Sequence, residues 1–108
     1  MLEINKVLAV VVTYNRLNML QQCIHYLTEY NPELEILVVN NASTDGTYEY
    51  LENLKQANPK IIVHQLQENI GGACGLSRGM RAACELGYDA AWIMDDDCFV
   101  QKTTLTEF

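Results

Sequence analysis

Four short apolar runs predict the strands of a sheet. The first is rich in Val and apolar at almost every position, which is typical of a strand buried on both faces, as in a parallel sheet. Val7–Val12 is the longest unbroken run, and it is far shorter than the roughly 20 residues that span a membrane. The four predicted strands are residues 6–13, 35–39, 61–66 and 90–94.

Between these runs, apolar residues recur every three or four positions, which predicts helices that turn one face toward the sheet. The apolar faces consist of Leu17, Leu20, Ile24 and Leu27; of Tyr48, Leu51 and Leu54; and of Leu76, Met80 and Ala83. Asn15 is expected to cap the first helix, because its side-chain oxygen can satisfy a free backbone N–H group. Residues 102–108 are predicted to begin a fourth helix, with Thr103 or Thr104 as its cap.

Strands that alternate with helices predict an α/β fold. Crossovers between parallel strands are almost always right-handed, so the chain should build an open, mainly parallel, Rossmann-like sheet with helices on both faces. The 108 residues are 49% hydrophobic and 19% charged, which suits one globular unit, and no linker or repeat interrupts them. We therefore expect residues 1–108 to form a single α/β unit.

The charge of the chain limits its partners. Seven basic and fourteen acidic residues give a net charge of -7, which excludes a nucleic-acid surface because little positive charge is available to neutralise phosphates. The four cysteines lack C-x-x-C spacing, so a zinc site is not expected. Glu3 stands where a signal peptide would carry positive charge. We expect no transmembrane segment and a cytoplasmic location, or a peripheral one at the inner membrane face for the full-length protein.

Polar residues follow every predicted strand. In an open α/β sheet the carboxyl ends of parallel strands share one edge, and ligands bind in the crevice outside it. We therefore predict that these residues converge on one site. Helix capping is the alternative for Thr13 and Asn15, and turn and cap formation is the predicted role of residues 43–46. Gly71 and Gly72 could merely permit a tight backbone turn, but they would also let a ligand approach the backbone closely. The polar clusters are Thr13–Asn15, Asn40–Asn41, residues 68–72 and Asp95–Asp97.

Three adjacent carboxylates close the last predicted strand. Asp95, Asp96 and Asp97 repel one another, so the arrangement is costly unless solvent or a cation compensates the charge. Side chains alternate along a strand, so Asp95 and Asp97 lean the same way and are the predicted ligands of Mn²⁺ or Mg²⁺. Such a cation could bridge this acidic protein to a diphosphate. His25 and His64 are expected to be ordinary surface or packing residues.

Four sequence blocks, in this order and spacing, resemble the family 2 glycosyltransferases, which have the GT-A fold. The resemblance covers essentially the whole chain, and its glycine block is most similar to the galactofuranosyl- and rhamnosyl-transferring branch. It implies that residues 1–108 are the N-terminal, donor-binding half of a glycosyltransferase domain that is truncated at its C-terminus. The blocks are VVVTYNR at 10–16, ILVVNNASTDGT at 36–47, ENIGGACGLSRGM at 68–80 and WIMDDD at 92–97.

The activity implied by the resemblance is an inverting, metal-dependent transfer of a sugar from a UDP- or dTDP-sugar to a hydroxyl of a glycan or lipid-linked acceptor. Such a reaction would serve the synthesis of cell-wall or surface polysaccharides. The catalytic base is expected beyond residue 108, so this chain alone should be inactive.

The resemblance also implies roles for individual residues. Thr13, Asn15 and Arg16 would surround the nucleobase and ribose, Asn41 would face the base, and Asp96 would reach the ribose or sugar. Arg78 would lie near the donor phosphates. The family often has an acidic residue where Asn41 stands, and its branch often has glycine where Cys74 stands. The full implied binding set is Thr13, Tyr14, Asn15, Arg16, Asn41, Asn69, Gly71, Gly72, Arg78, Asp95 and Asp96, with Asp95 and Asp97 as metal ligands.

Other protein classes fit the sequence less well. A phospho-receiver domain needs an acidic pair after the first strand, where Thr13–Asn15 stands, and a haloacid-dehalogenase-type phosphatase needs its D-x-D element on the first strand. A nucleotidyltransferase would carry a glycine-rich, basic loop after the first strand, which is absent here. The nucleotidyltransferase and a non-catalytic nucleotide-binding module remain the alternatives.

Overall fold

The computed structural model describes residues 6–96 and 104–107, except for the side chains of Asp95 and of residues 104–107. This part of the chain forms a five-stranded sheet flanked by helices. The elements in chain order are β1 (Val7–Thr13), α1 (Leu17–Tyr30), β2 (Glu35–Asn40), α2 (Thr47–Ala57), β3 (Ile61–Gln65), α3 (Gly72–Glu85), β4 (Ala90–Asp95) and β5 (Thr104–Glu107).

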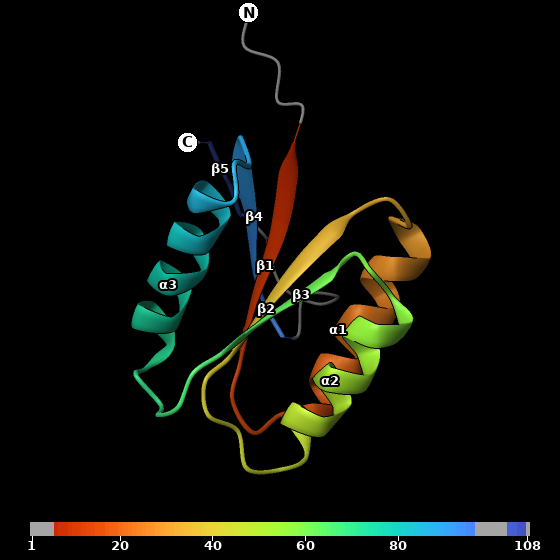
Figure 1. Cartoon of the computed structure of the whole chain (residues 1–108), viewed down its shortest axis with the longest axis vertical. Helices are drawn as coiled ribbons and strands as arrows, with labels where there is room; N and C mark the ends of the chain where they lie inside the picture. Colours follow the sequence, from red (N-terminus) through yellow and green to blue (C-terminus); the bar gives the residue numbers. More distant parts are fainter. Residues whose placement is uncertain (1–5, 97–103, 108) are drawn as a thin grey trace, which may run out of the picture.

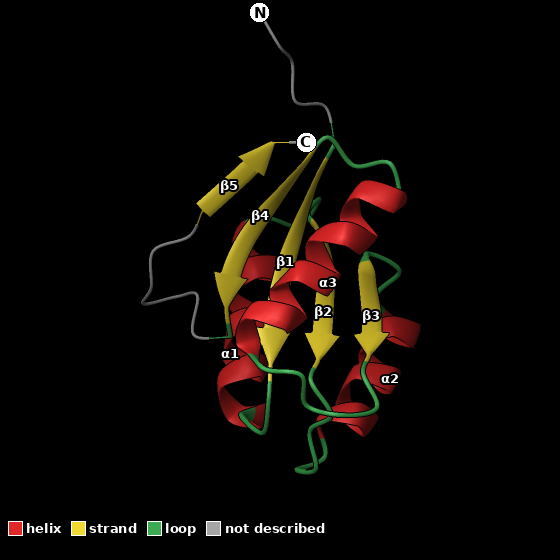
Figure 2. Ribbon diagram, turned by 90° about the vertical axis from the view of Figure 1, so that its left-hand side faces the viewer, coloured by secondary structure: helices red, strands yellow, loops and turns green. Residues whose placement is uncertain are grey.

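The sheet has the strand order β3-β2-β1-β4-β5, with β1 in the centre. β1 pairs in parallel with both β2 and β4, and β2 pairs in parallel with β3. Figure 2 shows that these four strands all end at the same edge of the sheet. In the register of the central strands, Thr13 lies beside Asn40 and Val12 beside Asp95. The predicted α/β fold with a mainly parallel sheet is confirmed.

Helices cover both faces of the sheet, with α3 on one side and α1 and α2 on the other (Figure 1). Because side chains alternate along a strand, Ala9 and Val11 pack in the core that includes α1 and α2, whereas Leu8 and Val10 pack in the core that includes α3. All four are fully buried. This explains why β1 is apolar at successive positions.

Helix α3 lies very close to the sheet at Gly79. A Cβ atom at this position would be 2.5 Å from Val10 Cγ1 and 3.0 Å from Val39 Cγ2. The first distance is shorter than a Cβ atom tolerates and the second is tighter than most van der Waals contacts, so a larger side chain would force the helix or the two Val side chains to move. Gly79 therefore fixes how closely α3 packs on β1 and β2.

The helix predicted over residues 102–108 is wrong. Residues Thr104–Glu107 instead form β5, which pairs antiparallel with β4 from Ile93↔Thr104 to Ala90↔Glu107. A helix of this length is marginal without packing, whereas β4 offers a free edge with unpaired backbone groups. Alternating Thr and Leu suit that edge. Residues 97–103, with the expected cap Thr103, lie outside the described part.

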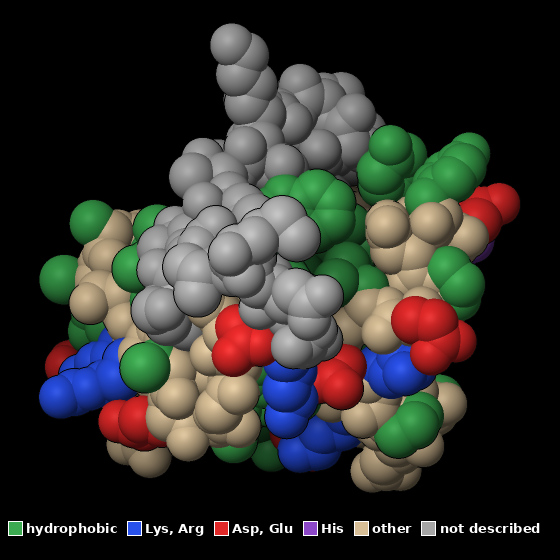
Figure 3. All heavy atoms as spheres, turned by 90° about the horizontal axis from the view of Figure 1, so that it is seen from above, with side chains coloured by type: hydrophobic (Ala, Val, Ile, Leu, Met, Phe, Trp, Pro, Cys, Tyr) green, Lys and Arg blue, Asp and Glu red, His purple; other side chains and the backbone are tan. Residues whose placement is uncertain are grey.

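Charges are mixed at the end of the molecule where the strands begin. Figure 3 looks onto this end, and the acidic and basic side chains of the described residues are interspersed there. None of the described helices has the length and apolar character that crossing a membrane requires. The polar clusters predicted from the sequence lie at the opposite end of the sheet, where the parallel strands end.

Candidate functional site

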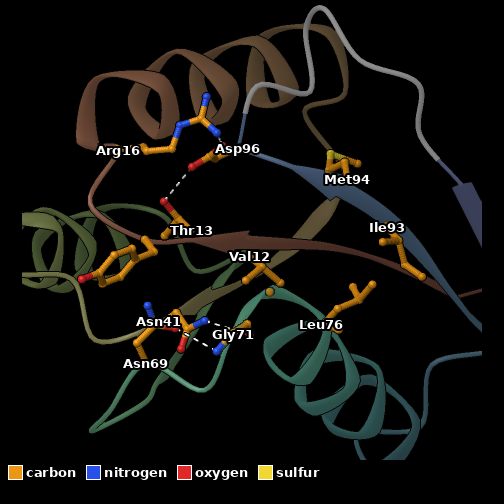
Figure 4. A pocket seen from close by; sticks show the side chains of 13 residues that line it. Val12, Thr13, Arg16, Asn41, Asn69, Gly71, Leu76, Ile93, Met94 and Asp96 are labelled. Atoms are coloured by element: carbon orange, nitrogen blue, oxygen red, sulfur yellow. Dashed lines mark hydrogen bonds and ion pairs between the residues drawn. The ribbon is translucent and has the colours of Figure 1, made fainter.

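A pocket of about 410 Å³ opens where β1 and β4 end. Residues from β1, β4, the loops after β1 and β2, and the start of α3 contribute to it (Figure 4). The predicted convergence of the polar clusters at one edge of the sheet is thus confirmed. The lining residues are Val12, Thr13, Tyr14, Arg16, Asn41, Asn69, Gly71, Gly72, Ala73, Leu76, Ile93, Met94 and Asp96.

Asp96 forms the acidic side of this pocket. Its side chain is only 5% exposed, and a buried carboxylate is stable only when hydrogen-bonded or paired with a cation. Thr13 Oγ1 donates to Asp96 Oδ2 at 3.1 Å, and Arg16 Nη1 lies 3.1 Å from Asp96 Oδ1. The half-exposed Arg16 thus compensates one of the three adjacent carboxylates, and both partners fix the direction of the Asp96 carboxylate.

The opposite side of the pocket is the loop between β3 and α3. Gly71 has φ 84°, a conformation that glycine adopts without steric cost, and its N–H donates to Asn69 Oδ1 at 2.8 Å. Asn41 bonds to this loop through both ends of its amide, at Ile70 N and Gly71 O. Figure 4 shows Asn41, Asn69 and Gly71 grouped on the other side of β1 from Asp96, with the Asn41 amide directed at the loop. The loop is therefore held by side chains rather than by sheet pairing.

Asn15 does not cap α1, so that prediction is wrong. Asn15 adopts a left-handed conformation with φ 49°, and its Oδ1 accepts a hydrogen bond from Thr44 N at 2.6 Å. The first N–H of α1, at Leu17, donates instead to Asp45 Oδ2 at 3.0 Å. Asp45 Oδ1 also accepts from Thr47 N and Oγ1 at the start of α2. One carboxylate from the β2–α2 loop thus serves two helix N-termini and ties both loops together.

The contacts of Asp45 change its acidity. Burial acts to raise its pKa, but hydrogen bonds from the Thr47 hydroxyl and from the N–H groups of Leu17 and Thr47 together outweigh burial and lower the pKa from 3.8. The carboxylate is therefore ionised at neutral pH. A negative charge at two helix N-termini also interacts favourably with both helix dipoles.

Among the described side chains, most of the residues predicted from the sequence line this one pocket, but Asn15 and Arg78 do not. Asn15 lines a separate hollow with Asp45 and residues 16–19. Arg78 lines another pocket, together with His64 and Glu68, and not the one that contains Asp96. The side chain of Asp95 lies outside the described part. The predicted residues that the structure brings together are Thr13, Tyr14, Arg16, Asn41, Asn69, Gly71, Gly72 and Asp96.

The apolar members of the pocket were not predicted from the sequence. Val12 and Ile93 precede the polar clusters on β1 and β4, and Leu76 faces them from α3 (Figure 4). Each is only partly buried, unlike the neighbouring strand residues of the core. Val12 and Ile93 could have been found from the sequence, because each lies on a strand shortly before the polar residues at its end. Ala73 and Met94 complete this set.

The residues predicted to bind a metal are only partly described. Asp97 lies outside the described residues, and for Asp95 only the backbone is known, at the end of β4 beside Val12. Within the described part, no three His, Cys, Asp or Glu side chains gather to hold a metal ion. Asp96 already bonds to Thr13 and Arg16. Carboxylates at this strand end are the donor type that Mg²⁺ and Mn²⁺ take, so the chemistry of Asp95 and Asp97 fits such an ion.

The amino-acid sequence matches the model of the family described as "Glycosyl transferase family 2" over residues 8–108. The chain belongs to this family. The undecaprenyl-phosphate mannosyltransferase of Micrococcus luteus is 33% identical over 94 residues, which are 85% of this chain and 38% of that protein. The poly-beta-1,6-N-acetyl-D-glucosamine synthase of Staphylococcus aureus is 37% identical over 68 residues, 63% of this chain and 16% of that protein. The chain thus spans well under half the length of these relatives.

Solved structures give the same fold. The mannosyltransferase PcManGT from Pyrobaculum calidifontis, in complex with GDP-Man and Mn²⁺, aligns with a TM-score of 0.73 and 27% identity over 85% of this chain and 27% of its own. Residues 1–349 of TarS from S. aureus, in complex with UDP-GlcNAc, align with a TM-score of 0.70 and 27% identity over 85% of this chain and 26% of their own. Membership of family 2 is confirmed, and the galactofuranosyl- and rhamnosyl-transferring branch stays a prediction.

Proposed function

We propose that this chain is the donor-binding part of a glycosyltransferase, which transfers a sugar from a nucleoside diphosphate to an acceptor hydroxyl. The observation that carries the proposal is Asp96, a buried carboxylate fixed by Thr13 and Arg16 on one side of the strand-end pocket. The glycine-bearing loop and the start of α3 form the other side. Family membership supports a nucleotide sugar as the occupant.

The donor would lie between these two sides. Asp96 would accept a hydrogen bond from a ribose or sugar hydroxyl, with its direction set by Thr13 and Arg16. The backbone around Gly71 and Gly72 leads into α3, and a helix N-terminus with accessible N–H groups suits a phosphate. The partly buried Val12 and Ile93 would offer apolar contact. We propose a UDP- or dTDP-sugar as the donor, which the UDP-GlcNAc of the TarS complex supports, whereas the PcManGT complex contains GDP-Man.

The proposed metal ligands are Asp95 and Asp97, for Mn²⁺ or Mg²⁺. A divalent cation bound there would neutralise the diphosphate and stabilise it as a leaving group. The Mn²⁺ of the PcManGT complex supports a metal in this family. Because Asp96 is already paired with Arg16, we assign it to the donor hydroxyls rather than to the metal.

The complete protein would add the remaining parts of the reaction. We propose that a base outside residues 1–108 activates the acceptor hydroxyl, which attacks the anomeric carbon from the face opposite the departing diphosphate and inverts it. The acceptor would be a glycan or a lipid-linked sugar. The names of the two bacterial relatives, an undecaprenyl-phosphate mannosyltransferase and a poly-beta-1,6-N-acetyl-D-glucosamine synthase, support such acceptors. We propose a role in the synthesis of cell-wall or surface polysaccharides, at the cytoplasmic side of the membrane.

The variant Asp96→Asn tests this proposal. It removes the charge that Arg16 compensates and halves the acceptor capacity toward a hydroxyl, so we expect UDP to bind at least about tenfold more weakly in the presence of Mn²⁺. Isothermal calorimetry measures the dissociation constant. The control is Asp89→Asn, which removes the same charge just before β4 begins, at the opposite end of the sheet. Equal affinities for wild type and Asp96→Asn would contradict the proposed site.

A further inference from the structure

Asn41 is a buried side chain whose amide bonds at both ends to the glycine-bearing loop. It follows β2 directly and is 2% exposed. Its Nδ2 donates to Gly71 O at 3.0 Å, and its Oδ1 accepts from Ile70 N at 2.9 Å. The orientation of the amide is fixed, because a backbone N–H can only donate and a carbonyl can only accept. Asn41 thus bonds to two successive residues of the pocket wall (Figure 4).

The carbonyl of Gly71 connects Asn41 to helix α3. The same oxygen that accepts from Asn41 Nδ2 also accepts from Gly75 N, at 2.9 Å, in the first turn of the helix. The position of Asn41 therefore determines where the first hydrogen bond of α3 forms. Asn69 accepts a hydrogen bond from Gly71 N, so the position of Asn41 also affects where Asn69 lies.

Gly75 limits how close α3 comes to Asn41. A Cβ atom on Gly75 would lie 3.1 Å from Val12 Cγ1 and 3.4 Å from Asn41 Nδ2, so the helix rests directly on β1 and on the Asn41 amide. The hydrogen bonds of the Asn41 amide hold the loop close to β2, and the van der Waals contact at Gly75 sets the shortest distance that α3 can reach. Together these contacts define the distance between the loop and the central strand.

We propose that Asn41 is a positioning residue of the donor site, which holds the Ile70–Gly71 backbone at the spacing from Asp96 that the nucleotide sugar requires. This inference rests on the proposed function. It replaces the expected contact between Asn41 and the nucleobase, because both ends of the amide already bond within the chain. Aspartate has the same shape but no donor for Gly71 O, and it would place a negative oxygen against that carbonyl.

The test compares Asn41→Asp with the matched control Asn40→Asp. Asn40 is fully buried at the end of the same strand, its Oδ1 accepts from Ser43 N, and its Nδ2 donates to Gln65 Oε1 at 2.8 Å. Both substitutions therefore keep an acceptor, lose a donor and bury a charge, but Asn40 does not line the pocket. The measurements are thermal unfolding, hydrogen exchange of the Gly75 amide, and calorimetric titration with UDP, dTDP and GDP in the presence of Mn²⁺.

We expect both variants to melt at lower temperature than wild type. Only Asn41→Asp should increase the exchange rate of the Gly75 amide and raise the dissociation constant of every nucleotide by about tenfold or more. If Asn41→Asp does not fold, Asn41→Ala and Asn40→Ala give the same comparison without a buried charge. Equal weakening by both substitutions would overturn the inference, as would a loss confined to one base, which would indicate direct base contact. Absence of nucleotide binding by the wild type would instead refute the proposed function, and the Gly75 exchange rates would still test whether Asn41 holds the loop.

Discussion

At the scale of single residues, the structure separates side chains that face the pocket from side chains that hold other parts in place. Asp96 lines the pocket and has its charge compensated by Arg16. Asp45 lies away from this pocket and joins the N-termini of α1 and α2. The sequence predicted a turn or capping role for Asp45 and a binding role for Asp96, and the hydrogen bonds of Asp45 agree with the first. The sequence did not predict that Asp45 would serve two helices.

The role of Asp45 predicts a dependence of stability on pH. Because its folded pKa lies below 3.8, its ionised form stabilises the native state above the unfolded pKa, and this contribution is lost as the pH falls through the folded value. We expect Asp45→Ala to lower the free energy of unfolding by about 1 kcal/mol at pH 7, and the gap to shrink below pH of about 4. Urea unfolding at several pH values measures this difference.

Asp45→Asn is the matched control, since it keeps an oxygen acceptor but does not titrate. It should lose less stability than Asp45→Ala at pH 7. A gap between wild type and Asp45→Ala that stays constant down to pH 3 would show that the ionised carboxylate is not what stabilises the two helices.

At the scale of elements, the placement of α3 determines the shape of the pocket. Its first turn rests on Val12 and Asn41 at Gly75, and its middle rests on Val10 and Val39 at Gly79. Two glycines four residues apart share one helical face, so the N-terminal part of the helix can approach the sheet closely. The pocket wall at Gly71 and Gly72 is the start of this closely packed helix.

Gly79→Ala should therefore destabilise the protein, although alanine is the better helix former. The new Cβ would meet Val10 at 2.5 Å, and such overpacking costs more than the propensity gain of about 1 kcal/mol, so we expect a net loss of about 1–2 kcal/mol. Chemical denaturation measures it. Gly72→Ala, whose Cβ would meet nothing within 4 Å, is the control and should not lose stability. A Gly79→Ala variant as stable as wild type would contradict the close packing of α3.

At the scale of the whole molecule, the sequence predicted the sheet and the edge that carries the site. The ends of the strands could be predicted because the apolar runs stop abruptly at Thr13, Asn40 and Asp95. Parallel strands place such ends at one edge of the sheet. The features that were missed depend on contacts between distant residues. Asp45 caps a helix 28 positions earlier in the chain. Arg78 lines a different pocket because Gly75 and Gly79 turn their face of α3 toward the sheet, and this orientation of the helix was not predicted.

The central claim is that this strand-end pocket binds a nucleoside diphosphate through a divalent cation. The most direct measurement is calorimetric titration of the chain with UDP, with Mn²⁺ and then with excess chelator. We predict a dissociation constant on the order of 0.1–1 mM with metal and no detectable binding without it, because Asp95 and Asp97 would then repel the diphosphate with no cation between them. Linkage requires that UDP tighten Mn²⁺ binding by the same factor. Equal UDP affinity with metal and with chelator would contradict the account.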